Sequence, residues 1–228
     1  MAFRINGNGA VKHFRNFEKE NSDMNSTPRY PAFIAKSAIL LSVLVLPLSS
    51  TGVLAHEATG LAGGFASGFM HPILGWDHVA AMVAVGLWGG LLGAPAIWLL
   101  PIVFPLVMAV GGAMGVAGVP VPGVEAGIAA SAIALGILVA TGARPPLWIA
   151  AIIVGAFAIF HGHAHGTELP VAADATAYAI GFVIGTGLLH VVGITFGLAT
   201  KWNSGKVVVR SLGGAIAVAG LAFLTGMA

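Results

Sequence analysis

The chain has 228 residues, of which 57% are hydrophobic and 8% are charged. An ordinary soluble domain carries about 25% charged residues, so this composition excludes a soluble globular protein and indicates an integral membrane protein. The formal net charge of +2 is too small to indicate a nucleic-acid partner. The chain has no cysteine, which excludes disulfides and a thiolate metal site. Any metal ion would be held by His, carboxylate, Met, backbone or water.

The N-terminal segment differs from the rest of the chain. Residues 1–36 hold six basic and three acidic residues without a sustained apolar period, which predicts a polar, disordered extension. Residues 37–55 form a signal-peptide pattern, in which the apolar run 37–48 is followed by Val53 and Ala55 at the −3 and −1 positions that signal peptidase prefers. We expect cleavage after residue 55, with an uncleaved signal anchor as the alternative. Met24 is a second candidate for the start of translation.

Residues 56–228 are predicted to form one permease domain, an all-α bundle of about six transmembrane helices. Its apolar stretches each approach the roughly 20 residues that a bilayer requires, and glycine, proline or charged residues separate them. The 33 glycines suit membrane helices, because glycine lets two helix backbones approach closely. The stretch Thr59–Met70 is expected at the outer interface or partly re-entrant. The predicted spans are Ile73–Leu92, Ala96–Ala117, Val124–Thr141, Leu147–His161, Ala175–Ala199 and Val207–Met227.

Charges in the loops predict the orientation in a bacterial cytoplasmic membrane. With the mature N-terminus outside, every basic residue of the domain lies inside, as the positive-inside rule requires. These basic residues are Arg144, Lys201, Lys206 and Arg210, and the acidic residues placed outside are Glu57, Glu125, Glu168 and Asp174. The outer acidic residues would attract cations to the entrance.

A first cluster of polar residues, His71, Asp77 and His78, interrupts an apolar stretch. Ionisable groups at membrane depth are costly and usually face a protein interior or a water-filled path. If the helix is regular from Pro72, His78 lies about 10 Å deeper than His71, and the two are successive stations for an ion. If Gly75 breaks the helix instead, His71 comes down beside Asp77.

A second cluster, His161, His163, His165 and Glu168, ends the fourth predicted span on the same side of the membrane. On a helix His161 and His165 share a face, whereas in an extended segment all three histidines do. We expect the two clusters to meet and to hold a divalent metal ion in transit. All seven residues of the two clusters are therefore assigned as candidate metal ligands.

Three further residues are assigned to the transport path. Glu125 opens the third span on the outer side, His190 is the deepest candidate to receive an ion, and Phe104 is a candidate gate beside Pro105. Each has a structural alternative: a solvated edge charge, a helix-to-helix hydrogen bond and a packing residue, respectively. Asp174 is expected to cap the fifth helix.

With these motifs the sequence resembles the HupE/UreJ family of bacterial nickel permeases. The matching motifs are His71-Pro72-x-x-Gly75-x-Asp77-His78 and His161-Gly162-His163-Ala164-His165-Gly166-x-Glu168, and the likeness covers about residues 56–227. The resemblance implies uptake of nickel, with cobalt as the alternative, for the maturation of hydrogenase or urease. It also implies roles for His71, Asp77, His78, His165, Glu168 and Glu125.

These observations predict secondary or passive transport, no enzyme activity and no tightly bound cofactor. The expected partners are the transported Ni²⁺ and the lipid bilayer, and a homo-oligomer is left open. The sequence contains no Walker-type motif for ATP hydrolysis. A competing interpretation is a membrane metalloenzyme with Asp77 as a base, although no His-Glu-x-x-His motif is present. Another is a haem carrier that uses His78 and His190 as axial ligands.

Overall fold

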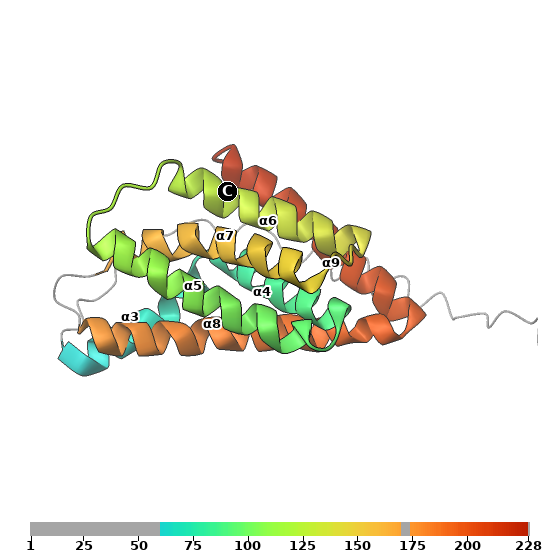
Figure 1. The fold of residues 1–228 in the computed structure, drawn as a ribbon, viewed down its shortest axis with the longest axis horizontal. Helices are drawn as coiled ribbons and strands as arrows, with labels where there is room; N and C mark the ends of the chain where they lie inside the picture. Colours follow the sequence, from blue (N-terminus) through green and yellow to red (C-terminus); the bar gives the residue numbers. More distant parts are fainter. Residues whose placement is uncertain (1–59, 170–173, 228) are drawn as a thin grey trace, which may run out of the picture. The chain divides into compact units, whose positions relative to one another are not determined.

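The computed structural model describes residues 60–169 and 174–227, which fold into helices joined by short turns. The predicted polar extension and signal peptide lie outside the described residues, so their boundaries stay predictions. Figure 1 shows the arrangement of the helices. In chain order the elements are α3 (Gly60–Leu74), α4 (Trp76–Leu92), α5 (Ala96–Val116), α6 (Val124–Thr141), α7 (Leu147–Thr167), α8 (Ala175–Gly197), the 3₁₀ helix η1 (Leu198–Lys201) and α9 (Asn203–Leu224).

The helices confirm the predicted all-α, multi-span membrane fold. Among the described residues, five helices are long and apolar enough to cross a bilayer, or six spans result if α3 and α4 count as one bent span. The second and third predicted spans agree with α5 and α6 to within one residue. Asp174 caps α8 as expected, because its Oδ1 accepts a hydrogen bond from the backbone N–H of Ala177 at 2.7 Å.

Two predicted boundaries are wrong because hydropathy measures apolar length and not helical hydrogen bonding. The fourth span does not end at His161, since α7 continues as helix to Thr167. The sixth does not begin at Val207, since α9 begins at Asn203 with a polar first turn. The histidines at the end of α7 and the polar first turn of α9 are not apolar, but both segments can form helical hydrogen bonds.

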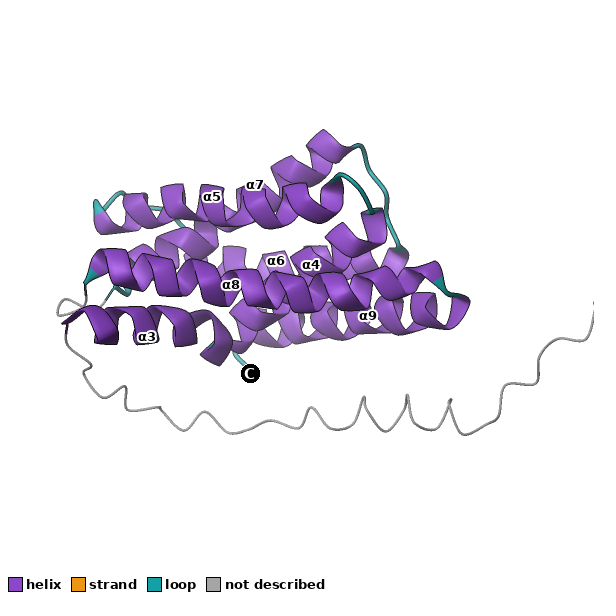
Figure 2. Cartoon of the chain, turned by 90° about the horizontal axis from the view of Figure 1, so that it is seen from below, coloured by secondary structure: helices purple, strands orange, loops and turns teal. Residues whose placement is uncertain are grey.

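The predicted start of the first span at Ile73 is also wrong. The helix α3 runs through Pro72 to Leu74, and α4 begins after Gly75 at an angle of 79° to it. Gly75 has φ −85° and ψ 109°, an extended conformation that ends one helix and starts the next. The stretch that was expected at the interface is therefore helical from Gly60, and it packs along α8 (Figure 2).

The helix α4 lies at the centre of the bundle, in contact with α5, α6, α8 and α9. Its middle residues are fully buried, among them Ala81, Met82, Val85 and Trp88. A helix that is apolar on all sides fits only such a position. The indole N–H of Trp88 donates to the carbonyl of Ala143 at 3.0 Å, which ties α4 to the turn before α7.

Close glycine contacts hold the helix pairs together. A Cβ at Gly115 of α5 would lie 2.5 Å from the carbonyl oxygen of His163 in α7, and one at Gly136 of α6 would lie 2.5 Å from the backbone of α9. Gly197 of α8 meets α4 in the same way. Such small residues let membrane helices pack backbone to backbone. The contact between α5 and α7 fixes the position of the histidine-rich end of α7.

Acidic and basic residues lie at opposite ends of the bundle. The end where α5 and α7 finish and α3, α6 and α8 begin carries Glu125, Glu168 and Asp174. The fourth described acidic residue, Asp77, lies in the first turn of α4 beside His78. The other end carries the described basic residues. The acidic set is Asp77, Glu125, Glu168 and Asp174, and the basic set is Arg144, Lys201, Lys206 and Arg210. Both histidine clusters lie at the acidic end, as the sequence predicts.

Candidate metal site

The break at Gly75 brings the parts of the first cluster together. The ring centroids of His71 and His78 are 6.2 Å apart, which matches the broken-helix geometry and excludes the regular helix from Pro72. Oδ1 of Asp77 accepts from the backbone N–H of His78 at 2.8 Å and lies 2.7 Å from Nδ1 of the same residue. Because a carboxylate only accepts hydrogen bonds, Nδ1 donates, and in the neutral ring the lone pair is on Nε2.

The helical end of α7 places His161 and His165 one turn apart on the same face. The ring of His165 is 4.7 Å from that of His71 and 4.5 Å from that of His78. The ring of His78 is in turn 4.9 Å from that of His161. These four imidazoles form a continuous series, here called the histidine row, in the order His71, His165, His78, His161.

The outer end of the histidine row carries a carboxylate. Oε2 of Glu168 lies 3.3 Å from Nε2 of His71, and their side chains are 52% and 32% exposed. One ligand atom each from His71, His165 and Glu168 all lie within 4.8 Å of one another. The hydrogen bond with His71 lowers the pKa of the Glu168 carboxyl, an effect that outweighs partial burial. This end is an accessible three-ligand mouth with a persistent negative charge.

The inner end of the row is fully buried. His161 is fully buried, and its Nε2 lies 2.9 Å from the hydroxyl of Ser131 on α6. The fully buried ring of Phe104 follows, 5.5 Å from His161 and 5.5 Å from His190 of α8. Phe104 therefore separates the histidine row from the next imidazole.

Two predicted residues lie apart from the row. His163 is two residues from its neighbours in a helix, so its ring turns to another side, where Nε2 lies 2.8 Å from the carbonyl oxygen of Val119. Glu125 is exposed in the first turn of α6 and is not among the grouped ligands at the mouth. The structure thus assembles five of the seven cluster ligands, Glu168, His71, His165, His78 and His161, with Asp77 behind His78.

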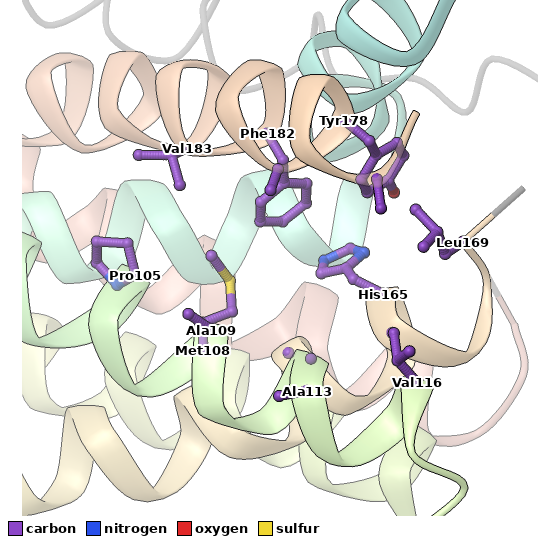
Figure 3. A pocket seen from close by; sticks show the side chains of 15 residues that line it. Pro105, Met108, Ala109, Ala113, Val116, His165, Leu169, Tyr178, Phe182 and Val183 are labelled. Atoms are coloured by element: carbon purple, nitrogen blue, oxygen red, sulfur yellow. The ribbon is translucent and has the colours of Figure 1, made fainter. Parts of the chain in front are cut away.

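Sequence reasoning missed Ser131 and the aromatic wall of the site. The ring of Phe182 lies 4.2 Å from His165, and that of Tyr178 lies 6.1 Å from His71. A mostly apolar pocket of about 220 Å³ lies between α5, α7 and α8. Figure 3 shows His165 at this pocket, with Tyr178 and Phe182 on the α8 side. A signal was present, because Tyr178, Phe182, Thr186 and His190 recur every four residues along α8.

Several buried ring nitrogens have no hydrogen-bond partner among the described residues. They are Nε2 of His78, Nδ1 of His161, Nδ1 of His163, and both nitrogens of His165 and His190. Buried polar atoms are nearly always paired, so each exception calls for an explanation. A neutral imidazole nitrogen is a common ligand for divalent transition metals. The row can therefore offer successive nitrogens to a metal ion that enters past Glu168.

A family model described as HupE / UreJ protein matches residues 34–223. The chain belongs to the HupE/UreJ family. The curated "Protein HupE" of Rhizobium leguminosarum bv. viciae is 45% identical over 193 residues, which cover 84% of this chain and 98% of that protein. No solved structure matches the chain. The resemblance that rested on the two histidine motifs is confirmed, and both motifs fall within the part of the chain that the HupE/UreJ model matches.

Proposed function

We propose that this HupE/UreJ protein carries Ni²⁺, or alternatively Co²⁺, across the cytoplasmic membrane into the cell for the maturation of hydrogenase or urease. The observation that carries the proposal is the histidine row, which opens at a carboxylate and in which several buried nitrogens have no hydrogen-bond partner among the described residues. A passing metal ion would supply the missing partner to each nitrogen in turn. The role is transport and not catalysis.

Capture takes place at the mouth. The carboxylate of Glu168 attracts the hydrated cation, and the imidazoles of His71 and His165 replace some of its water. The residual exposure of Glu168 and His71 leaves this exchange open to solvent. Selective binding that is still reversible is what conduction requires.

Transfer inward proceeds by exchange between neighbouring rings. His165 contacts both His71 and His78, so it belongs to the mouth and to the deeper part of the row at once. Asp77 holds Nδ1 of His78, which orients the ring and makes Nε2 a better ligand. From His161 the ion passes Phe104, whose ring moves aside, and reaches His190.

The membrane potential supplies the driving force. With the basic end inside, as the positive-inside rule favours, the mouth faces outward. A potential of 100 mV, negative inside, then favours entry of a divalent cation by about 4.6 kcal/mol, twice the value for one charge. This suffices for concentrative uptake without a coupled ion. The choice of nickel rests on the likeness to nickel permeases, because imidazole and carboxylate suit several divalent metals.

The test is accumulation of trace Ni²⁺, Co²⁺ and Zn²⁺ in cells that express the wild type or Asp77→Asn. We expect nickel accumulation in the wild type and its near-complete loss in the variant at equal membrane expression, because Asn cannot provide the charge behind His78. Asp174→Asn is the matched control. Asp174 is the N-cap of α8, and Asn caps a helix equally well.

An absence of accumulation for every metal in a correctly inserted wild type would contradict transport. If a stoichiometric metal ion also stayed bound through purification, a fixed-metal membrane enzyme would become the better hypothesis.

A further inference from the structure

Ser131 is a buried polar residue on an otherwise apolar face of α6. It is fully buried, and the other buried residues of α6 are aliphatic or glycine. Its hydroxyl donates to the carbonyl oxygen of Ile128 at 2.6 Å and lies 2.9 Å from Nε2 of His161.

Counting protons determines which nitrogen of His161 is free. A serine hydroxyl has one hydrogen. Here it is donated to the carbonyl oxygen of Ile128, because a carbonyl can only accept a hydrogen bond. The bond between Ser131 and His161 must then be donated by the Nε2–H of the ring. In the neutral imidazole the lone pair is left on Nδ1, which is buried and has no partner among the described residues.

His78 shows the same arrangement with its two nitrogens exchanged. The carboxylate of Asp77 accepts a hydrogen bond from Nδ1–H, and Nε2 is buried without a partner among the described residues. The two rings are 4.9 Å apart and nearly perpendicular, at 89°. Imidazole nitrogens bind divalent transition-metal ions at about 2 Å, so both rings are close enough to contact one ion.

We propose that Ser131 is a positioning residue that holds His161 in the Nε2–H tautomer, so that Nδ1 of His161 and Nε2 of His78 form a deep metal station. The metal part of this inference rests on the proposed function, whereas the tautomer does not. Unlike the mouth, the deep station has no carboxylate ligand. Hard cations such as Mg²⁺ and Ca²⁺ prefer oxygen ligands, so a station of two nitrogens rejects them. The mouth admits divalent cations, and the deep station selects among them.

The test compares Ser131→Thr with Ser131→Val. Both variants add the same bulk at this buried position, and only threonine keeps a hydroxyl that can bond to the helix carbonyl and accept from His161. Thr141→Val is the matched control, because Thr141 lies on the same helix and its hydroxyl bonds to the carbonyls of Ile137 and Leu138.

The first readout is ¹⁵N NMR of selectively labelled histidine in the metal-free full chain in lipid. We expect the Nε2–H tautomer of His161 in the wild type, Ser131→Thr and Thr141→Val, and its loss in Ser131→Val. The second is equilibrium dialysis with Ni²⁺ in the presence of excess Mg²⁺. Loss of the hydroxyl that orients His161 should weaken nickel binding about 10- to 100-fold in Ser131→Val, and in neither of the other two variants.

An Nδ1–H tautomer of His161 in the wild type, or the same tautomer in both Ser131 variants, would overturn the inference. So would unchanged nickel affinity in a variant that has lost the tautomer. If cells take up no nickel but the purified chain binds it with this dependence on Ser131, transport fails and the deep station stands.

Discussion

Individual side chains at the mouth determine how uptake responds to pH. The hydrogen bond with His71 holds the pKa of Glu168 below the ordinary value of 4.5. A carboxyl with a lowered pKa loses its charge only when the pH falls through that lowered value, so Glu168 stays ionised between pH 5 and 8. A metal ion binds only the unprotonated imidazole nitrogen, so acidification works against metal binding at the histidines.

We therefore expect the initial rate of Ni²⁺ uptake to fall as the external pH is lowered from about 7.5 to about 5.5, because protons compete with the metal for imidazole nitrogens. Glu168→Gln should lower uptake throughout this range, because the mouth loses its negative charge. Both are measured in vesicles at a clamped membrane potential. A rate that rises steadily on acidification would instead support coupling to protons.

At the scale of secondary-structure elements, the break between α3 and α4 builds the row. Gly75 adopts φ and ψ values that alanine can also adopt, so Gly75→Ala introduces no backbone strain. Its Cβ, however, would lie 3.0 Å from Oδ1 of Asp77 and 3.1 Å from Nδ1 of His78. These contacts are tight enough to displace the pair that orients His78.

Gly75→Ala should accordingly weaken nickel binding by about 10-fold or more while the chain still inserts into the membrane. Equilibrium dialysis on the purified protein measures the affinity, and membrane fractionation measures insertion. Gly187→Ala in α8 is the control, since a Cβ there meets no atom within 4 Å. Equal nickel affinity in the two variants would show that the geometry at the break does not matter.

The glycine contact between α5 and α7 is a second feature at this scale. A Cβ at Gly162 would overlap the carbonyl oxygen of Met108 and lie 2.9 Å from the backbone nitrogen of Gly112. Gly162→Ala must push the two helices apart, which we expect to lower the free energy of unfolding by about 1–3 kcal/mol. Thermal unfolding in detergent measures the loss. Gly214→Ala, where a Cβ meets open space, should be nearly neutral, and a neutral Gly162→Ala would contradict this packing.

At the scale of the whole molecule, the separation of charge between the two ends predicts how the protein lies in the membrane. Glu168 lies at the mouth, Glu125 and Asp174 lie at the same end of the bundle, and the described basic residues lie at the other end. Because basic loops stay in the cytoplasm, the mouth should face outward. The orientation stays a prediction until it is measured.

Cysteine labelling tests the orientation without background, because the chain has no cysteine of its own. Ala117 after α5 and Ser204 at the start of α9 are both exposed and lie at opposite ends. A membrane-impermeant thiol reagent should label Ala117→Cys in intact cells and Ser204→Cys only after permeabilisation. The reverse pattern would place the mouth inside and turn the proposed uptake into export.

The class of the protein, its family and most of its helices could be predicted from the amino-acid sequence alone. An apolar stretch long enough to cross the bilayer predicts a transmembrane helix. Because successive helices cross in opposite directions, the number of helices between the two histidine clusters places both clusters at the same end. The motifs around His71 and His161 were sufficient for the family. Each motif could be recognised because its residues are close together in the chain.

Which side chains contact one another depends on how the helices pack in the folded protein. The break at Gly75 turns His71 towards His78, and the continued helix of α7 keeps His165 in the row while it turns His163 away. Ser131 reaches His161 from another helix. Helical periodicity predicts which residues share a face, but the partner of that face depends on how distant helices pack, and here that packing depends on close glycine contacts between helices.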